Sequence, residues 1–531
     1  MGMNKFGAVA VWLACATPAF AEAPKQKDVW ITIGTDALEP ARAAFKAQGL
    51  ELPAPAREKA GVAALRVREA HLEKLAEAIH DKLNRCAGFI SHETEQQALM
   101  AVEGTSGVQS IGATAITYNI NNGPSVNAML GGVQELNIRN TINSLSTNWT
   151  SRRYNLQSGI DAANWLKNQW TTIANGRSDV SVALFTHAST VSPQPSVVAT
   201  ITGTTLPNEV VVIGGHLDSI NGSGASYAAP GADDDASGVA SLTEVFRVAI
   251  ANGYKPARTV KFMAYAAEEI GLKGSADIAN WHANNAVNVV GVLQLDMTNY
   301  KGSSYDFAMV TDNTNAALNT HTTNLISTYL PGLTWTNITC GYGCSDHASW
   351  TAKGYPATMP FEATMSTDNP QIHTANDTLS VTSGNANNSV KFAKLGVAFL
   401  GEVAKGATTG NTPPPTDGGG TTPPPTGTTL TNGVATAAYS GTTGSWKCWT
   451  LSVPTGKTSL VFNQTGLSGT TGDADLYVKL GSQPTTSSYN SRPYLGGSTE
   501  SCTLSNPASG TWYACSYGYS AYSNVTMKGT Y

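Results

Sequence analysis

The chain has 531 residues, a formal net charge of −5 and charged side chains at only 13% of its positions. This length exceeds what one hydrophobic core normally holds, so we expect two or three domains. No excess of basic residues is present, which argues against nucleic acid as a partner. A chain low in charge and rich in Gly, Ser, Thr and Asn is typical of secreted proteins.

Residues 1–21 have the three parts of a secretory signal peptide. Lys5 is basic, residues 6–16 are apolar, and residues 19–21 (AFA) fit the small-x-small cleavage rule. The apolar run is too short to span a membrane. We therefore expect a secreted, extracellular protein without a membrane span; the alternative interpretation of this run is a buried first strand or helix.

Residues 22–105 differ in composition from the rest of the chain. Residues 24–100 alone contain 11 Lys or Arg and 11 Asp or Glu. Residues 29–33 alternate like a strand, a second short strand ends at Val67, and Leu72, Leu75, Ile79 and Leu83 recur at helical spacing. The pattern predicts a small βαβα-like module, which we interpret as a propeptide; the alternative is a permanent accessory domain.

Residues 106–405 alternate between strand and helix patterns, which predicts an α/β domain with a mixed, mostly parallel central sheet flanked by helices. The candidate central strands are residues 210–213, 260–265, 289–295 and 307–310, and helical periodicity covers residues 160–170 and 316–329. Residues 406–429 contain two PPP blocks around a Gly triplet and are predicted to be a linker. Residues 430–531, rich in Gly, Ser, Thr and Tyr, predict a small antiparallel β-sandwich.

Polar residues follow the apolar strand at residues 210–213. His216 and Asp218 come directly after it, at the end of a strand where α/β proteins usually bind ligands. Further on, Asp233, Asp234 and Asp235 stand side by side before an amphipathic run. They could neutralise a helix N-terminus, but that is worth only about 0.3–1 kcal/mol per charge and does not need three of them. A divalent cation would relieve their repulsion.

Four more residues of this kind lie just beyond strands or in loops. Glu268 and Glu269 follow residues 260–265, Asp296 follows residues 289–295, and His373 lies in a loop after Phe361. One edge of the sheet could carry all of them. Two histidines and several carboxylates form a mixed nitrogen and oxygen ligand set, which suits Zn²⁺ better than Ca²⁺ or Mg²⁺.

Several long phrases resemble one enzyme family. They are GGHLDS (214–219), APGADDDASG (229–238), FMAYAAEEIGLKGS (262–275), LQLDMTNYKG (293–302), CGYGCSDHASW (340–350) and IHTANDTL (372–379). In this order they resemble the secreted bacterial leucyl aminopeptidases of the M28 metallopeptidase family, as found in vibrios. The likeness runs from about residue 137 to residue 404 and implies a fold of the zinc exopeptidase type.

The resemblance implies two zinc ions per chain. Asp234 would bridge both ions, His216 and Asp296 would complete one site, and Glu269 and His373 the other. Glu268 would be the catalytic general base. Asp218 would orient the His216 imidazole. The family also has a cis peptide after the bridging aspartate, here between Asp234 and Asp235.

The resemblance also implies a substrate with a free N-terminal amine and a leucine-like side chain. The apolar pocket for that side chain would be formed by Met297, Met359, Phe361 and Ile372, with a Cys340–Cys344 disulfide at its wall; the alternative for the Met and Phe residues is ordinary core packing. From spacing alone, these two cysteines could bridge a tight loop or form half of a metal site. The expected partners are peptides or proteins with a free N-terminus, and we expect a monomer.

The C-terminal segment resembles the pre-peptidase C-terminal domain of secreted bacterial proteases, through GDADLYVKLGSQPTTSSYNSRPY (472–494). That family commonly has a cysteine where Ser491 stands, bridged to the one that matches Cys502. The usual bridge therefore cannot form here. Cys448 could pair with Cys502 or with Cys515, which leaves one of the three without a partner in this domain.

Three other functions compete with this interpretation. Ser345, Asp346 and His347 could suggest a nucleophilic hydrolase, but three neighbouring residues cannot converge on one Oγ. A glutaminyl cyclase would have a similar fold with a single zinc ion. A non-catalytic secreted binding protein would use the β-domain, but it would not need the complete ligand set with Glu268.

Overall fold

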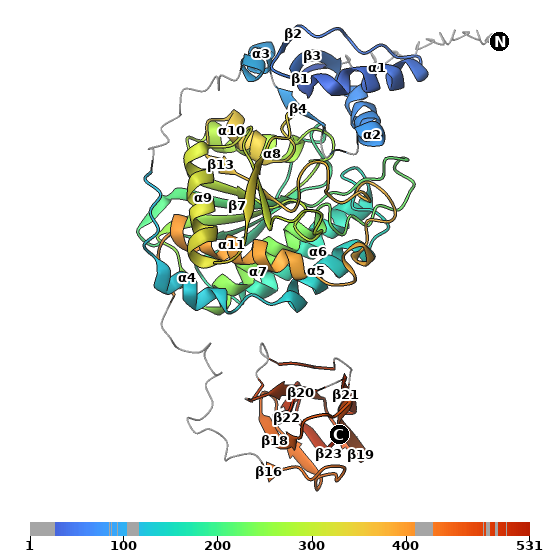
Figure 1. Cartoon of the computed structure of the whole chain (residues 1–531), viewed down its shortest axis with the longest axis vertical. Coiled ribbons are helices and arrows are strands. Elements are labelled where there is room, and N and C mark those ends of the chain that lie inside the picture. Colours follow the sequence, from blue (N-terminus) through green and yellow to red (C-terminus); the bar gives the residue numbers. More distant parts are fainter. Residues whose placement is uncertain are drawn as a thin grey trace, which may run out of the picture. The chain divides into compact units, whose positions relative to one another are not determined.

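The computed structural model describes residues 27–83, 85, 88–92, 94–103, 116–408, 428–481, 483–484, 489–493, 497–505 and 507–531. The chain divides into two compact units, residues 1–415 and 416–531. Figure 1 shows both units with their helices and strands. The predicted signal peptide, the junction between the first two predicted domains, and residues 409–427 of the predicted linker lie outside the described residues.

The first unit begins with a small α/β module. Its antiparallel sheet has the order β2 (Arg57–Lys59), β3 (Val62–Arg68), β1 (Asp28–Gly34) and β4 (Phe89–His92), and its helices are α1 (Leu38–Ala47), α2 (Leu72–Leu83) and α3 (Glu95–Glu103). The predicted strands and helix are present, but the βαβα expectation was incomplete, because it lacked β2, β4 and α3. The missed β2 is exposed along its length and has no apolar alternation, so its pattern gave no strand signal.

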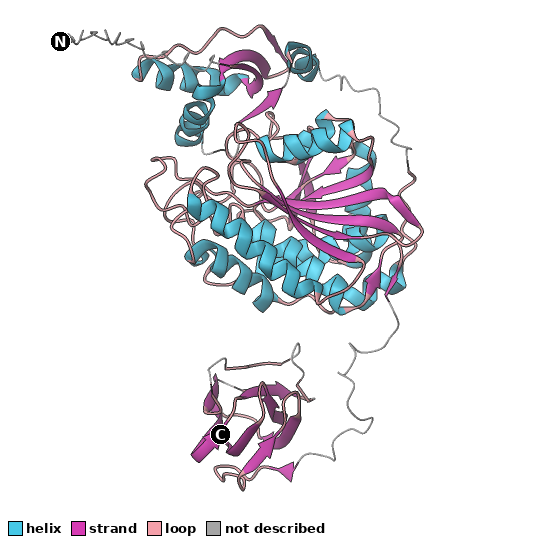
Figure 2. Cartoon of the chain, turned by 180° about the vertical axis from the view of Figure 1, so that it is seen from behind, coloured by secondary structure: helices cyan, strands magenta, loops and turns pink. Residues whose placement is uncertain are grey.

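A six-stranded mixed sheet forms the centre of the first unit (Figure 2). Its strands, in spatial order, are β13 (Ala357–Thr358), β10 (Asn288–Gln294), β7 (Leu206–His216), β9 (Arg258–Tyr265), β6 (Ser196–Ile201) and β5 (Val180–Phe185). The first four run parallel, and β6 and β5 are antiparallel to their neighbours. The sheet is therefore mixed and mostly parallel, as predicted.

Helices cover both faces of this sheet, because alternate residues of its strands face opposite sides. On β7, Val211 and Ile213 belong to one hydrophobic core, and Val210 and Val212 belong to another. The larger core is closed by α4 (Gly123–Leu130), α5 (Glu135–Thr147), α6 (Gln157–Ala174), α7 (Ala236–Ala251), α9 (Ala316–Tyr329) and α11 (Asn387–Val403). Across the sheet, α8 (Lys273–Asn284) and α10 (His347–Ala352) close the smaller core.

One predicted central strand lies in a different sheet. β11 (Phe307–Val310) pairs with β12 (Trp335–Ile338) and β14 (Pro360–Phe361), not with the central strands. All four residues of β11 are buried. A short apolar run indicates that a strand is buried, but it cannot indicate which neighbours the strand pairs with.

The two ends of the α/β region that contains the central sheet, residues 116–408, are bound to each other. The Glu402 carboxylate accepts hydrogen bonds from the backbone nitrogens of Asn121 and Asn122, at 3.0 and 2.8 Å. Lys405 donates to the carbonyl of Asn119 at 2.6 Å. Beyond them, β15 (Ala407–Thr408) pairs with β8 (Tyr254–Lys255). The chain thus enters and leaves this region at one place.

The second unit is a β-sandwich. One sheet has the order β16 (Thr428–Thr429), β18 (Trp446–Val453), β22 (Gly510–Gly518) and β20 (Ala474–Leu480); the other has β17 (Tyr439–Gly441), β23 (Tyr522–Thr530), β19 (Ser459–Thr471) and β21 (Glu500–Ser505). Inward-facing residues of both sheets form one core. The β16–β18 pair is parallel, so the sandwich is not antiparallel throughout as predicted.

Cys448 and Cys515, which face each other across β18 and β22, form a disulfide. Of the two pairings that the sequence left open, the structure therefore has the one that leaves Cys502 as a buried free thiol. Burial raises the pKa of this thiol, and a hydrogen bond with Ser491 acts in the opposite direction. A serine thus contacts Cys502 at the position where the resembled domain family has a bridging cysteine.

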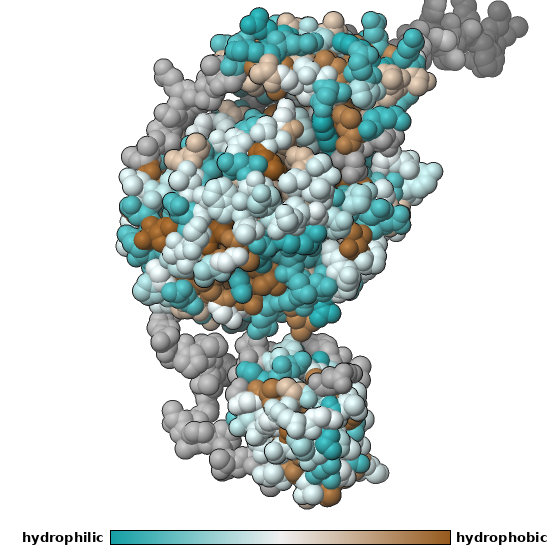
Figure 3. Space-filling view, viewed as in Figure 1, coloured by the Kyte–Doolittle hydropathy of each residue, from teal (hydrophilic) through white to brown (hydrophobic). Residues whose placement is uncertain are grey.

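Residues of intermediate to hydrophilic character, white to teal, cover most of the face seen in Figure 3, and hydrophobic residues appear there in separate patches. Among the described residues, no helix is long and apolar enough to cross a membrane.

Candidate active site

The polar residues predicted for the site meet at one edge of the central sheet. His216 is the last residue of β7, Glu268 and Glu269 follow β9, and Asp296 follows β10. These strands are parallel neighbours, so their carboxyl ends lie together. Asp234 reaches the same place from the loop before α7, and His373 from the loop after β14.

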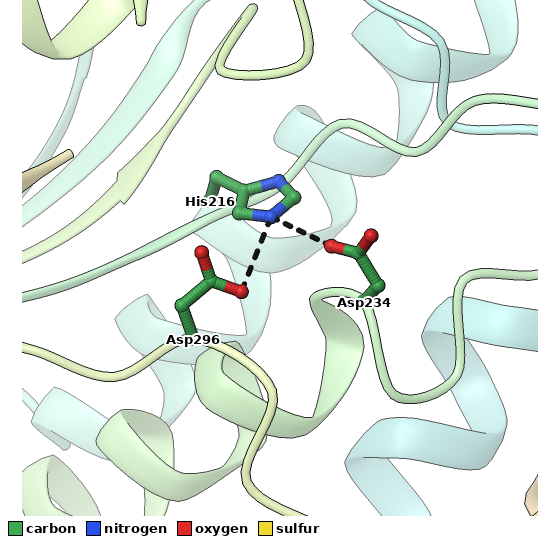
Figure 4. Close-up of side chains that lie close together, drawn as sticks. All are labelled: His216, Asp234 and Asp296. Carbon is green, nitrogen blue, oxygen red and sulfur yellow. Dashed lines mark hydrogen bonds and ion pairs between the residues drawn. The ribbon is translucent and has the colours of Figure 1, made fainter. Parts of the chain in front are cut away.

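Two groups of side chains each offer atoms that could hold a metal ion. His216, Asp234 and Asp296 form one group, and Asp234, Glu269 and His373 form the other. In the first group, His216 Nε2 lies 3.0 Å from Asp234 Oδ1 and 3.6 Å from Asp296 Oδ1 (Figure 4). In the second, His373 Nε2 lies 2.9 Å from Asp234 Oδ2 and 3.2 Å from Glu269 Oε2. The two oxygens of Asp234 thus face different histidines.

These distances fit zinc coordination. Zinc bonds of about 2.0–2.2 Å to histidine and carboxylate place neighbouring ligand atoms of a tetrahedral site roughly 3.3–3.5 Å apart. The buried charge fits too, because burial raises the pKa of Asp233 to about 6 and the pKa values of Glu269 and Asp346 to about 7. Cations would relieve the repulsion among these carboxyl groups.

Glu268 lies beside both groups but belongs to neither. Its side chain is fully buried, and neither carboxylate oxygen accepts a hydrogen bond from any residue that the structure describes. Burial raises the pKa of Glu268 well above its usual range, while the charge of His216 lowers it. A carboxylate with available lone pairs and a perturbed pKa, next to possible metal ligands, has the properties of a general base.

Asp218 lies against His216, but its main contacts differ from those expected. Its carboxylate accepts hydrogen bonds from the backbone nitrogens of Glu268, at 3.0 Å, and Glu269, at 3.3 Å. The nearest partner of His216 Nδ1 is the Asp218 backbone carbonyl at 3.1 Å, and the carboxylate is 3.6 Å away. Asp218 therefore holds both the imidazole and the segment that carries the two glutamates.

The peptide between Asp234 and Asp235 is cis.

The loop that carries Asp234 is held by residues that the sequence analysis did not single out. The Asp377 carboxylate accepts hydrogen bonds from the backbone nitrogens of Asp233 and Asp234, each at 3.1 Å. The buried Arg152 donates to four backbone carbonyls, among them Leu217 and Gly231. Arg152 has no motif of its own, and its partners are backbone atoms distant in sequence, so no signal in a single sequence could have revealed it.

Ser345 has a different role from the one considered for it in the sequence. Its hydroxyl donates to Asp296 Oδ2 at 2.6 Å and accepts from Gln294 Nε2 at 3.1 Å. It thereby orients a possible metal ligand. It directly follows the Cys340–Cys344 disulfide, which is present in the structure.

The four residues predicted for the substrate pocket line one cavity, which also includes Asp296 and Cys344. All four are at least 95% buried: Met297, Met359, Phe361 and Ile372. The cavity thus adjoins the first ligand group. Its open volume is about 20 Å³, which is enough for about one water molecule and too small for a leucine side chain.

Arg85 of the N-terminal module lines the same cavity. Its guanidinium lies 4.8 Å from the centre of the Tyr342 ring, which also lines the cavity, and donates to Asp36 Oδ1 at 3.1 Å. Arg85 could not be singled out from the sequence, because no motif near it distinguishes it from the other arginines of the module.

Other contacts hold the module against loops of the candidate site. Phe89 packs so closely on Gly271 that a Cβ there would lie 2.3 Å from its ring. Ile90 packs on Gly343 in the same way. On another side, the buried Arg153 forms ion pairs with Glu73 and Glu77 of α2. The module therefore contacts the loop that carries the two glutamates and the loop that lines the cavity.

Comparisons with known proteins agree with this site. The profile of Peptidase family M28 matches residues 196–398, and that of the Bacterial pre-peptidase C-terminal domain matches residues 447–518. Leucine aminopeptidase 1 of Arthroderma otae is 36% identical over 311 residues, which are 55% of this chain and 80% of that protein. Leucine aminopeptidase 1 of Trichophyton rubrum is 35% identical over 313 residues, 56% of this chain and 82% of that protein.

Two solved structures from Legionella pneumophila share the fold. The LapA aminopeptidase has a TM-score of 0.59 and 28% identity, over 71% of this chain and 99% of that chain. LapB has a TM-score of 0.59 and 26% identity, over 71% of this chain and all of that chain. The narrower likeness to vibrio enzymes stays a prediction. With its ligand groups at the sheet edge and relatives matched over four fifths of their length, the chain belongs to peptidase family M28.

Proposed function

We propose that the protein is a secreted, zinc-dependent aminopeptidase that releases leucine-like N-terminal residues from peptides. The observation that carries this proposal is the pair of ligand groups that share Asp234, with the buried Glu268 beside them. The relatives that bear the name leucine aminopeptidase support it.

The five ligands His216, Asp234, Glu269, Asp296 and His373 would hold two zinc ions per chain. Zinc bound there supplies Lewis acidity, which polarises a carbonyl group and lowers the pKa of a coordinated water. Glu268 takes a proton from the attacking water and delivers it to the leaving amine, which a carboxylate within reach of both atoms can do. Asp218 keeps the backbone of Glu268 in place during both transfers.

The cavity lined by Met297, Met359, Phe361 and Ile372 would receive the substrate side chain. Its lining is apolar, and methionine side chains adapt their shape easily, so a leucine-like side chain suits it. Secretion is supported by the predicted signal peptide and by the two disulfides, which persist in oxidising compartments. We expect the mature enzyme to act as a monomer.

We further propose that the N-terminal module keeps the full-length chain latent. Arg85 helps to reduce the cavity to the volume of about one water molecule, and the module contacts the loops on either side of it. A leucine side chain cannot enter while the module is in place. Removal of residues 22–105 would therefore activate the enzyme.

The proposed function is tested by metal analysis together with hydrolysis of a leucyl anilide by protein that lacks residues 1–105. We expect two zinc ions per chain, loss of hydrolysis with a chelator, and recovery on addition of zinc. Full activity with one zinc ion would contradict the two-ion site. Cyclisation of an N-terminal glutamine without hydrolysis of the anilide would instead indicate a glutaminyl cyclase.

A further inference from the structure

Away from the ligand groups, Ser196, His187 and Asp277 form a continuous hydrogen-bonded chain. His187 Nε2 lies 2.8 Å from Ser196 Oγ, and His187 Nδ1 lies 2.7 Å from Asp277 Oδ2. A carboxylate can only accept, so Nδ1 carries a proton, and in the neutral imidazole Nε2 then accepts from the serine hydroxyl. The order serine, histidine, carboxylate is that of a nucleophilic hydrolase.

Ser196 is nevertheless not placed to act as a nucleophile. It is fully buried at the start of β6, and its oxygen also accepts a hydrogen bond from the backbone nitrogen of Ala266 at 2.9 Å. Both directions of its hydroxyl are thus used within the protein, and a substrate carbonyl has no approach. The chain of hydrogen bonds ends on the backbone of Ala266.

Ala266 begins the segment 266–269, which connects β9 to the two glutamates of the site. The next residue, Ala267, has φ +54°, a left-handed conformation that is unfavourable for a residue other than glycine. Such a conformation persists only where the surroundings hold it. Asp218 holds the far end of the segment, at the backbone nitrogens of Glu268 and Glu269. Ser196 holds the near end.

We propose that Ser196, fixed by His187 and Asp277, is a positioning residue that sets the place of Glu268 through the backbone of Ala266. This inference rests on the proposed role of Glu268 as the general base. His187 commits the serine hydroxyl hydrogen, so an oxygen lone pair stays directed at the Ala266 nitrogen. Asp277 lies on α8. The backbone nitrogen of Lys273, the first residue of α8, donates a hydrogen bond to the Ala267 carbonyl, so the segment is also bound to this helix. Strand, segment and helix therefore close a ring of hydrogen bonds behind the base.

Two substitutions that introduce side chains of equal size distinguish the effect of the hydroxyl group from the effect of packing. Ser196→Thr keeps the hydroxyl, and Ser196→Val replaces it with a methyl group of the same shape. Both are made in the full-length chain, so that it folds with the N-terminal module in place, and are assayed with a leucyl anilide after limited proteolysis has removed the module. We expect Ser196→Val to have a kcat about 10-fold below that of Ser196→Thr, with similar KM and zinc content, because Ser196 contacts neither substrate nor metal.

Thr259 provides the matched control at the opposite end of β9. Its hydroxyl also accepts a backbone hydrogen bond, from the Gly203 nitrogen at 3.0 Å. Thr259→Val should lower the melting temperature as Ser196→Val does, but should leave kcat unchanged. Equal kcat values for the valine and threonine variants of Ser196 would overturn the proposal, as would an equal loss of kcat in Thr259→Val.

A second arm applies if neither Ser196 variant folds. The side chain of Asp277 is 35% exposed. Asp277→Asn therefore alters the hydrogen bond to His187 without changing a fully buried residue. We expect a several-fold lower kcat at unchanged KM and zinc content, and an unchanged kcat would overturn the proposal. Glu268→Gln is assayed in parallel: if it retains activity, the proposed base is wrong, whatever the Ser196 variants show.

Discussion

The sheet edge in the catalytic region and the C-terminal sandwich bury their side chains in opposite ways. At the sheet edge, carboxylates, histidines and arginines are buried close together, and many have strongly shifted pKa values. The sandwich core consists mainly of aliphatic and aromatic side chains, and a disulfide joins two of its strands. All nine histidines of the chain precede the sandwich.

This difference indicates that the sheet edge serves function, whereas the core of the sandwich serves stability. Buried charges destabilise a fold unless they are paired or bind ions, so a region that contains so many of them is built for chemistry. The sandwich gains its stability from apolar burial and can be independent of that chemistry. The experiments below challenge this division, beginning with the largest expected effect.

Glu268→Gln should lower kcat by about 10²–10⁴-fold, the usual contribution of a general base. Zinc content should stay at the wild-type level, because Glu268 belongs to neither ligand group. Stopped-time anilide assays and metal analysis measure both values. Glu244→Gln is the control, since Glu244 is also buried but pairs with Arg247. A variant of Glu268 that lost its zinc would refute the division between base and ligands.

Asp234→Asn should lose metal from both groups at once, because its two oxygens face different histidines. Asp296→Asn and Glu269→Gln should each weaken metal binding by one group, and by more than the roughly 10–100-fold that is typical when an outer partner of a ligand is lost. Zinc titration against a chelator measures these affinities. If Asp234→Asn retained one tightly bound ion, its bridging role would be wrong.

Deleting residues 1–105 should raise kcat/KM for a leucyl anilide well above that of the full-length chain. Arg85→Ala in the full-length chain should raise it only a few-fold, because a partly exposed ion pair such as that between Arg85 and Asp36 contributes about 1 kcal/mol or less. Arg66→Ala is the control, since Arg66 belongs to the same module and pairs with Asp28, but is not among the described residues that line the cavity. Equal activity of the full-length and deleted chains would exclude latency.

Acid should destabilise the first unit through its buried neutral histidines. Burial, together with the charge of Lys405, lowers the pKa of His321 to about 4. The ordinary value is 6.5, so between pH 6.5 and 4 the unfolded chain binds more protons than the folded one, and stability present above pH 6.5 is lost as the pH falls.

His321→Gln should therefore show a smaller fall in melting temperature between pH 7 and pH 4.5 than the wild type. Calorimetry of both proteins measures this, and the transition of the histidine-free sandwich serves as an internal reference. The same fall in both proteins would mean that His321 is not responsible.

The smallest effect is expected from deletion of residues 430–531. The sandwich offers none of the side chains of the two ligand groups. Sites that share no partners act independently to within about 0.5 kcal/mol, so kcat/KM for small substrates should change by about two-fold or less. A larger loss, measured with the anilide, would give the sandwich a part in catalysis.

The sequence was sufficient to place those candidate site residues that directly follow predicted strands. His216, Glu268 and Asp296 stand just beyond three apolar runs, and those runs are parallel neighbours in the structure. The family resemblance added the roles of Asp234 and His373. Arg152 and Asp377 could not be found, because they bind backbone atoms and their types carry no pattern. The pairing of β11 was missed for a related reason, since burial alone does not select a neighbour.

The joining of residues 119–122 to residues 402–405 has a consequence for engineering. Ends that meet in space can be linked without distorting a fold, and domains with such ends usually tolerate circular permutation. The catalytic region could therefore be reopened at an exposed turn such as the one at Asn175 and Gly176, after α6, while a short glycine linker joins its present ends. In such a circular permutant, the N-terminal module and the sandwich could be attached at the new ends of the chain.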